Sequence, residues 1–340
     1  MNNKISRRSF LSGSAAALAT ASIAPIATSC QTTPVPSFPG IYDFGSKFGG
    51  VQIGAITYSW RNMPGGLENI IKYCKETGIN SLELMSGDLE AFLGAPSRPN
   101  IPRLPRDLPP PPGSPTPVEI AAMTEKYNAD VRAFRAGVTP EKVAAAKKMF
   151  DDAGIIIHTV KYSPGRMSDE DINYAFNTAK LMGAKAVSDE MSEANVKRLA
   201  PFAEKHGMYA SLHNHDQFAL PLEEFDIDEL LSVSPAIKLN FDVGHYYGST
   251  GLNPCDILRK YHDHIYSVHL KDLTGPEVGI RNDYHIFGQG QTPLEEVLLL
   301  IKKEGWPMYV DVELEYPIKP WSNQVKETKT CVQYSRNILI

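Results

Sequence analysis

Eight short runs rich in β-branched and aromatic residues recur along the chain from residue 51 onward, with helix-like segments between them. In those segments apolar residues return every three or four positions, the spacing of a helix that covers a sheet. Strands that alternate with helices predict a parallel sheet, and eight strands are the number that closes a (β/α)8 barrel. The predicted strands are residues 51–60, 79–85, 155–163, 184–191, 208–215, 237–245, 266–273 and 308–316.

The main alternative within the α/β class is a doubly wound open sheet. That fold usually has a glycine-rich phosphate-binding loop after its first strand, and SWRNMPGG at residues 59–66 does not have that pattern. A chain with 42% hydrophobic and 21% charged residues is typical of a globular protein. Its net charge of −5 gives no reason to expect nucleic-acid binding. We therefore predict a single-domain α/β protein with the (β/α)8 or TIM-barrel fold.

One segment interrupts the alternation of strands and helices. Residues 96–117 are dense in proline, which excludes a helix interior or a central strand. The segment follows the second predicted strand, so in a barrel it would lie on the face where the strands end. It is expected to be a lid or partner surface, or else a surface insertion without a role. The barrel is expected to span residues 51–320, with residues 321–340 packing on it.

Residues 1–30 have the order of an export signal: basic residues, then an apolar run, then small residues. The adjacent Arg7 and Arg8 resemble a twin-arginine signal, and the residues before Cys30 resemble a lipidation motif. The alternative is a disordered basic tail. On the first interpretation residues 31–50 are a linker and the protein is exported, to the periplasm or the cell envelope. Its contact with the membrane would then be a lipid anchor at Cys30.

Ionisable residues gather at the carboxyl ends of the predicted strands. In a barrel these ends meet at one mouth, so their side chains are expected to converge. Carboxylates and imidazoles without a thiolate are a ligand set suited to Mn²⁺, Mg²⁺, Co²⁺ or Zn²⁺. The strand-end residues are Lys161, Glu190, His213, His215, Asp242, His245, His269, Lys271, Glu313 and Glu315.

The alternation of side chains along a strand separates inward from outward positions. In the last strand Asp311, Glu313 and Glu315 share the face toward the barrel axis. In the fourth strand Glu190 points inward and Asp189 outward. The inward carboxylates are therefore the candidates for a site.

Five motifs at these strand ends resemble the xylose-isomerase-like TIM-barrel superfamily, and within it the sugar phosphate isomerase/epimerase-like proteins. The resemblance covers residues 51 to about 318. It implies one divalent metal, most often Mn²⁺, with Co²⁺, Mg²⁺ and Zn²⁺ as alternatives, held by Glu190, Asp242, His269 and Glu313. The motifs are VSDEM (187–191), SLHNHDQ (211–217), LNFDVGH (239–245), YSVHLKD (266–272) and FGQG (287–290).

The chain departs from the ketose epimerase pattern at its fifth strand. In those relatives the first glutamate ligand comes from that strand, whereas here the strand carries His213 and His215, and the glutamate comes from the fourth. That arrangement is more similar to the inosose dehydratase and 3-keto-sugar branches. The expected catalytic residues are His215, His213, Glu313 and Lys161. The expected substrate-binding residues are His245, Lys271, Glu315, Gly288 and Gly290, with a purely structural role as the alternative for His245.

These residues predict an enzyme that acts on a small sugar. A cation at the mouth would polarise a carbonyl and stabilise an enediolate as the neighbouring proton leaves. The first expectation is a sugar isomerase or epimerase acting on a ketose or keto-sugar. The alternative is a lyase or dehydratase that cleaves a 3-keto-glycoside or an inosose-like substrate. A non-catalytic carbohydrate-binding barrel is the third interpretation.

Replacing both Arg7 and Arg8 with lysine is expected to keep the protein in the cytoplasm, because a twin-arginine signal requires the paired guanidinium groups. Cell fractionation checks this, with the unaltered chain as the control. A variant that still reaches the envelope would show that the segment is not such a signal.

Overall fold

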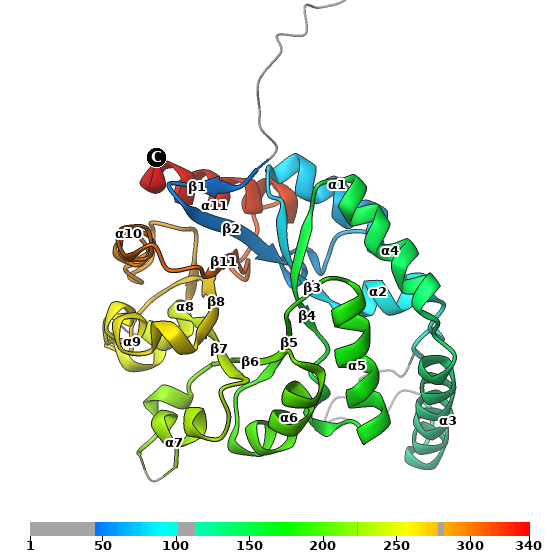
Figure 1. The fold of residues 1–340 in the computed structure, drawn as a ribbon. Coiled ribbons are helices and arrows are strands. Elements are labelled where there is room, and N and C mark those ends of the chain that lie inside the picture. Colours follow the sequence, from blue (N-terminus) through cyan, green and yellow to red (C-terminus); the bar gives the residue numbers. More distant parts are fainter. Residues whose placement is uncertain (1–44, 101–112, 223, 278–281) are drawn as a thin grey trace, which may run out of the picture. The chain divides into compact units, whose positions relative to one another are not determined.

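The computed structural model describes residues 45–100, 113–222, 224–277 and 282–340. Its central feature is a sheet of eight parallel strands (Figure 1). The strands are β2 (Val51–Ile56), β3 (Ser81–Met85), β4 (Ile156–Lys161), β5 (Ala186–Glu190), β6 (Tyr209–His213), β7 (Ile237–Asp242), β8 (Ile265–Leu270) and β11 (Tyr309–Val312).

The sheet closes on itself. The strands pair in the order β2-β11-β8-β7-β6-β5-β4-β3, and β2 also pairs with β3. Val310 of the last strand lies opposite Ile53 of the first, and Ala55 lies opposite Leu82 across the other seam. The predicted (β/α)8 barrel is therefore confirmed.

The helices surround the strands in Figure 1 and cover their outward faces. Apolar residues such as Val160, Leu239 and Val268 are fully buried between the two layers. The helices are α1 (Leu67–Thr77), α2 (Ser86–Leu93), α3 (Pro117–Ala136), α4 (Pro140–Asp152), α5 (Asp169–Leu181), α6 (Glu193–His206), α7 (Ile227–Ser232), α8 (Val243–Thr250), α9 (Pro254–Tyr261), α10 (Leu294–Glu304) and α11 (Gln324–Leu339).

The two ends of the described barrel differ in detail from the sequence-based boundaries. Strand β1 (Lys47–Phe48) pairs antiparallel with β2, so the last part of the expected linker 31–50 belongs to the barrel. Helix α11 contacts α1 and α10 and is the helix that follows the eighth strand. Residues 1–44, including the expected export signal, lie outside the described residues. In the described part, no helix combines the length and the apolar character that a membrane span requires.

Several predicted strands are shorter in the structure because turns and helices begin where their polar ends start. A 3-10 helix (Thr57–Trp60) follows β2, and α8 begins directly after β7. Asp242 makes this sharp change of direction by capping α8: its Oδ1 accepts a hydrogen bond from the His245 backbone N–H at 2.7 Å. The strand ends are thus polar because they begin the next helix and also face the barrel mouth.

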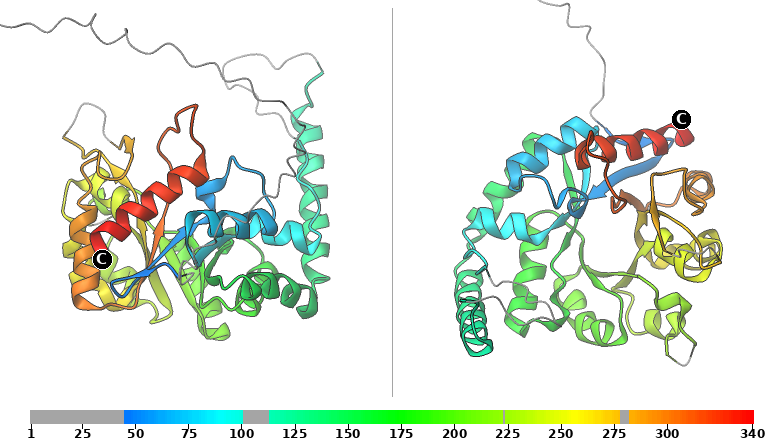
Figure 2. Two further views of the ribbon diagram at one scale, coloured as in Figure 1. Left: turned by 90° about the horizontal axis from the view of Figure 1, so that it is seen from above. Right: turned by 180° about the vertical axis from the view of Figure 1, so that it is seen from behind.

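Helix α3 is an addition that the strand–helix alternation did not predict. It begins with a capping box between Thr116 and Glu119 and has no buried residue. Figure 2 shows it projecting along the edge of the barrel, where it contacts α5. Residues 101–112 of the proline-dense segment lie outside the described residues, so its expected role as lid or insertion stays a prediction.

The floor of the barrel interior is polar. The register of β3 and β4 shifts between Leu82 and Glu83, an irregularity of the kind that re-aims a side chain. His158 Nε2 lies 2.9 Å from Asp311 Oδ2, and its Nδ1 lies 3.0 Å from Ser81 Oγ. Tyr309 stacks on the imidazole ring at 4.1 Å. This hydrogen-bonded network is buried in the barrel interior, beneath the mouth.

We expect His158→Ala to lower the free energy of unfolding by about 3 kcal/mol or more, because the buried Asp311 carboxylate loses its hydrogen-bond partner. Urea denaturation followed by circular dichroism measures this. The control is Lys126→Ala, which removes an exposed ion pair with Asp130 and should leave stability nearly unchanged. Similar small losses in both variants would contradict a stabilising role for the buried pair.

Candidate active site

Four side chains with metal-binding atoms meet at the barrel mouth, three from the neighbouring strands β6, β7 and β8 and one from the residue directly after β11. They are His213, Asp242, His269 and Glu313, and one ligand atom of each lies within 4.8 Å of the others. His213 Nε2 is 3.3 Å from Asp242 Oδ2 and 3.5 Å from Glu313 Oε2. His269 Nδ1 is 2.6 Å from Glu313 Oε2. All four residues are buried.

This geometry fits a single divalent cation. Two ligand atoms bound about 2.1 Å from a tetrahedrally coordinated ion lie about 3.4 Å apart. The two distances from His213 Nε2 are close to that value, whereas His269 Nδ1 and Glu313 Oε2 would have to separate. Two imidazole nitrogens and two carboxylate oxygens form a donor set that suits Zn²⁺, Co²⁺ or Mn²⁺.

Glu190 lies beside this cluster and not within it. Its Oε2 is 3.3 Å from His213 Nδ1 and 3.0 Å from His215 Nε2, and its Oε1 accepts a hydrogen bond from Lys161 at 2.7 Å. Of the four ligands implied by the resemblance, the structure therefore brings together Asp242, His269 and Glu313. His213 is the fourth member of this cluster, and it also belongs to a second group of metal-binding atoms with Glu190 and His215.

Lys271 supplies a buried positive charge between several carboxylates. Its Nζ lies 3.1 Å from Asp242 Oδ2, 3.1 Å from Glu313 Oε2 and 2.7 Å from Glu315 Oε2. Burial alone would lower the pKa of Lys271, but these carboxylates outweigh it and hold that pKa well above its usual value. Lys271 therefore stays protonated over the working pH range.

Burial and the neighbouring Lys271 together keep His245 in its neutral form. Its Nε2 lies 2.8 Å from Lys271 Nζ, and an ammonium can only donate, so the imidazole nitrogen accepts. Burial lowers the pKa of His245 to about 3, and Lys271 shifts it in the same direction against the opposing charge of Asp242. His245 therefore positions groups around it and is a poor proton carrier.

Glu83 is a site residue that the sequence reasoning missed. It is fully buried on β3 and accepts hydrogen bonds from Ser188 Oγ at 2.5 Å and Asn240 Nδ2 at 2.8 Å. Its Oε2 also lies 2.8 Å from His269 Nε2, the nitrogen that faces away from Glu313. Burial would raise the pKa of Glu83, but His269 outweighs burial and lowers it to about 2. A carboxylate behind a metal-binding histidine fixes the ring's orientation and tautomer.

Gly288 and Gly290 have a role within their own loop. Their backbone N–H groups donate to Asp272 Oδ2 at 2.8 and 3.0 Å. A Cβ at Gly290 would lie 2.2 Å from Asp272 Oδ1, so the close approach that needs glycine is made by this carboxylate. The geometry gives no support to their expected contact with substrate.

A cavity of about 410 Å³ opens beside the cluster. His215 forms part of its wall with its side chain 51% exposed, and its ring stacks on His245 at 4.6 Å. The cavity is lined by His215, Asp216, Gln217, His245, Ser249, Asn282 and Tyr284. The strand-end residues thus have a space in which a small ligand can reach them.

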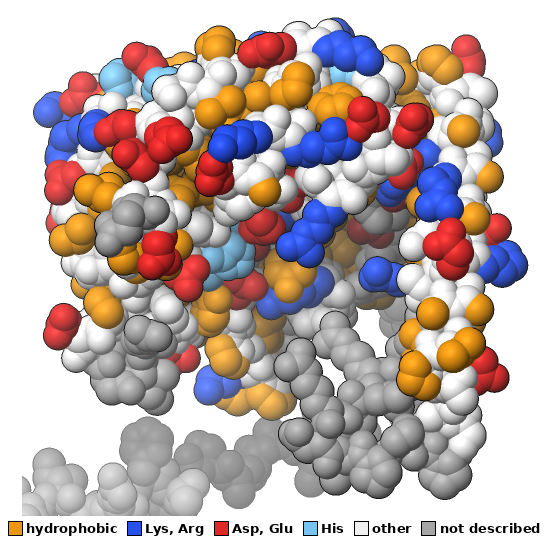
Figure 3. Space-filling model, turned by 90° about the horizontal axis from the view of Figure 1, so that it is seen from below, with side chains coloured by type: hydrophobic (Ala, Val, Ile, Leu, Met, Phe, Trp, Pro, Cys, Tyr) orange, Lys and Arg blue, Asp and Glu red, His pale blue; other side chains and the backbone are white. Residues whose placement is uncertain are grey.

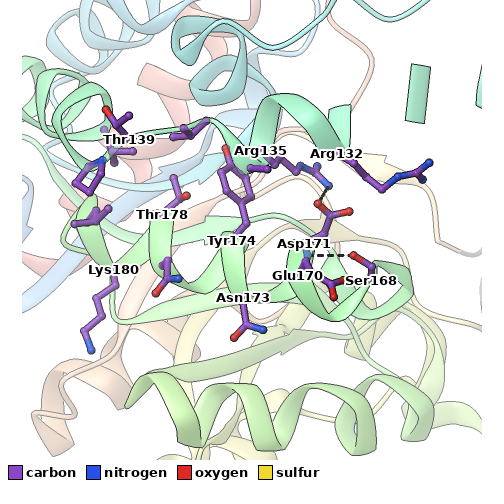
Figure 4. Close-up of a pocket in the computed structure, with 16 residues that line it drawn as sticks. Arg132, Arg135, Thr139, Ser168, Glu170, Asp171, Asn173, Tyr174, Thr178 and Lys180 are labelled. Carbon is purple, nitrogen blue, oxygen red and sulfur yellow. Dashed lines mark hydrogen bonds and ion pairs between the residues drawn. The ribbon is translucent and has the colours of Figure 1, made fainter. Parts of the chain in front are cut away.

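A larger cavity of about 850 Å³ lies among α3, α4 and α5 (Figure 4). Tyr174, Arg135 and Asp171 line it, and none of the clustered ligand-type residues does. Arg135 pairs with Asp171 at 3.4 Å there. On the face drawn in Figure 3, basic and acidic side chains are interspersed, without a broad region of one charge. Neither feature marks a second reaction centre.

The profile of a protein family described as "Xylose isomerase-like TIM barrel" matches residues 118–334. Two similar curated proteins are inosose dehydratases. The one from Clostridium botulinum (strain Alaska E43 / Type E3) is 32% identical over 151 residues, covering 36% of this chain and 49% of that protein. The one from Yersinia enterocolitica is 31% identical over 133 residues, covering 34% and 44%. The chain spans about half the length of the curated relatives it matches.

Solved structures share the fold at low identity. A xylose isomerase domain protein from Alicyclobacillus acidocaldarius has a TM-score of 0.57 at 14% identity, covering 84% of this chain and 98% of that one. The IOLI protein with a binding zinc atom has a TM-score of 0.55 at 14% identity, covering 85% and 98%. The probable 3-DHS dehydratase AsbF from Bacillus anthracis has a TM-score of 0.53 at 14% identity, covering 83% and 98%.

Two substitutions distinguish His213 from Glu190 as a metal ligand. We expect His213→Gln to weaken metal binding at least about 10-fold, because it removes one of four converging donors. Glu190→Gln should keep nearly full metal content, since it lies outside that group. Inductively coupled plasma mass spectrometry after dialysis measures metal per chain, with His206→Ala on α6 as the control. Loss of metal from Glu190→Gln together with full metal content in His213→Gln would instead identify Glu190 as the ligand.

Proposed function

Because the chain belongs to the xylose isomerase-like TIM-barrel family, we propose that it is a metal-dependent lyase acting on a keto-sugar or keto-polyol. The enzyme removes a proton next to a ketone, and the group on the following carbon leaves as water or an alcohol. The observation that carries this proposal is the placement of His213, an imidazole, among the four clustered side chains where ketose epimerases have a carboxylate. The similarity to inosose dehydratases supports the same reaction class.

His213, Asp242, His269 and Glu313 would hold the cation, which when bound supplies a Lewis acid that polarises the ketone. The resemblance favours Mn²⁺, and the second imidazole makes Zn²⁺ an equal candidate. Glu83 keeps the His269 ring in the orientation that this requires.

His215 is the proposed general base. Its Nε2 is engaged with Glu190, and within the described residues its Nδ1 carries no hydrogen bond. Burial would raise the pKa of Glu190, but His213, His215 and Lys161 outweigh burial and keep this carboxylate ionised. An ionised carboxylate orients the imidazole and stabilises the charge that it gains on accepting a proton. The same imidazole can then return that proton to the departing oxygen.

Lys161 fixes the position of Glu190, the carboxylate that orients His215. Its Nζ donates to Glu190 at 2.7 Å. Burial would lower the pKa of Lys161, but Glu190, Glu83 and Glu313 outweigh it and raise that pKa. The lysine therefore stays a cation and holds Glu190 in place beside His215.

Isomerisation or epimerisation is the second candidate. It begins with the same proton removal but requires a second proton-handling group on the other side of the substrate. Glu315, whose Oε2 lies 2.7 Å from Lys271 Nζ and 4.0 Å from His245 Nε2, is the candidate for that group. The proposed setting is the periplasm or envelope, on the basis of the sequence around Arg7, Arg8 and Cys30.

Incubation of the metal-loaded protein with keto-inositols, ketoses and 3-keto-glycosides in deuterated water separates these reactions by product NMR. A lyase product lacks the leaving group, whereas an epimerase product carries deuterium at the inverted carbon. We expect elimination. Products with deuterium and an intact leaving group would replace the lyase with an isomerase, and no turnover of any substrate would favour a carbohydrate-binding barrel.

His215→Ala is expected to retain its metal but to lose turnover by roughly 10²–10⁴-fold, the usual contribution of a general base. Steady-state rates on the best substrate measure this, with His206→Ala as the matched histidine control outside the mouth. Near-normal rates in His215→Ala would exclude it as the base.

A further inference from the structure

A second cavity of about 460 Å³ opens at the barrel mouth, on the side of β11. Its wall comes from the loop after the first strand, the segment after β11 and the first turn of α11. Residues that line it include Arg61, Asn62, Glu315, Ser322, Asn323 and Gln324. Because Glu315 Oε2 lies 2.7 Å from Lys271 Nζ, this cavity borders the proposed reaction centre.

The two mouth cavities meet at one pair of side chains. His245 lines the first cavity and Glu315 lines the second, and His245 Nε2 lies 4.0 Å from Glu315 Oε2. Lys271 Nζ contacts both groups. A ligand that reaches across this pair would therefore occupy both cavities while passing the buried lysine.

The wall of the second cavity offers free hydrogen-bonding groups. Within the described residues, the side chains of Asn62, Ser322 and Gln324 make no hydrogen bond. Arg61 uses its Nη1 on the carbonyl oxygens of Tyr58 and Leu314 and leaves its other donors open. Amide, hydroxyl and guanidinium groups in one cavity match the many hydroxyls of a sugar.

An exposed indole ring belongs to the same loop. Trp321 lies between Pro320 and Ser322, which both line the cavity, and it is 78% exposed. So exposed a tryptophan contributes little to the core, and its flat apolar face can pack on the C–H face of a sugar ring.

We propose that the second cavity is a subsite for a second sugar unit, so that the substrate is a two-ring glycoside. This inference rests on the proposed function: the proposed base, His215, lines the first cavity, so the reacting keto-sugar ring would lie there. Each cavity has the size range of a small-ligand site. In a glycoside whose ketone lies two carbons from the glycosidic carbon, the carbon between them gives up its proton. The glycosidic C–O bond breaks, a double bond conjugated to the ketone forms, and the second sugar leaves as an alcohol with that proton.

The test measures binding of sugars that cannot react. Isothermal titration calorimetry and saturation-transfer NMR compare glucose with maltose, cellobiose, trehalose and sucrose on the metal-loaded protein. We expect at least one disaccharide to bind roughly 10-fold more tightly than glucose, the contribution of one or two added hydrogen bonds. The near-isosteric double variant Asn62→Leu/Gln324→Leu should remove this preference and leave glucose binding unchanged. Gln333→Leu, on the exposed part of α11, is the matched control.

Equal binding of glucose and every disaccharide, or no disaccharide binding up to about 50 mM, would overturn the subsite. A preference that survives in the double variant would overturn it as well. Because these sugars carry no ketone, a disaccharide preference without turnover of keto-sugars would reject the lyase and retain the subsite.

Discussion

The mouth of this barrel depends on the compensation of buried negative charge. Asp242 and Glu313 are buried, and the partly buried Glu315 shares their contact with Lys271. Two unit charges 4 Å apart repel by about 4 kcal/mol at an effective dielectric constant of about 20. Lys271 contacts all three carboxylates, and the imidazoles of His213 and His269 contact the inner two. These contacts allow several carboxylates to remain ionised in a space that excludes most water.

Beneath the mouth, the side chains of the site are held by two successive layers of buried polar residues. Glu83 joins β3 to β5, β7 and β8 through Ser188, Asn240 and His269. The His158–Asp311 pair lies in the floor beneath it. The inward faces of the strands therefore form a connected polar network, while their outward faces pack against the helices as an ordinary apolar core. Rotamers in the site are set by partners on several different strands, which favours a preorganised geometry.

The alternation of strands and helices predicted the barrel, and the polar strand ends predicted most of the residues at its mouth. Glu83 was missed because SLELM reads as an apolar strand, while its partners lie 105 to 186 residues away in sequence. The inward turn of His158 depends on the register of two paired strands, which a single strand does not encode. Whether His213 or Glu190 joins the cluster depends on distances between strands that only the closed barrel sets. Helix α3 was missed because it buries no residue and so lacks an apolar period.

The closure of the sheet also determines the stage of folding at which the site is completed. Strand β11 pairs with β2, and Ser59 donates a hydrogen bond to the carbonyl of Val312, 253 residues further along the chain. Contacts of such sequence separation form late, because the chain must lose a large amount of freedom before they stabilise it. Glu313 directly follows β11, so the cluster at the mouth is incomplete until this eighth barrel strand has left the ribosome and paired with its neighbours. A metal ion can therefore meet the full set of four donors only once the barrel has closed around it, and not while the earlier strands fold.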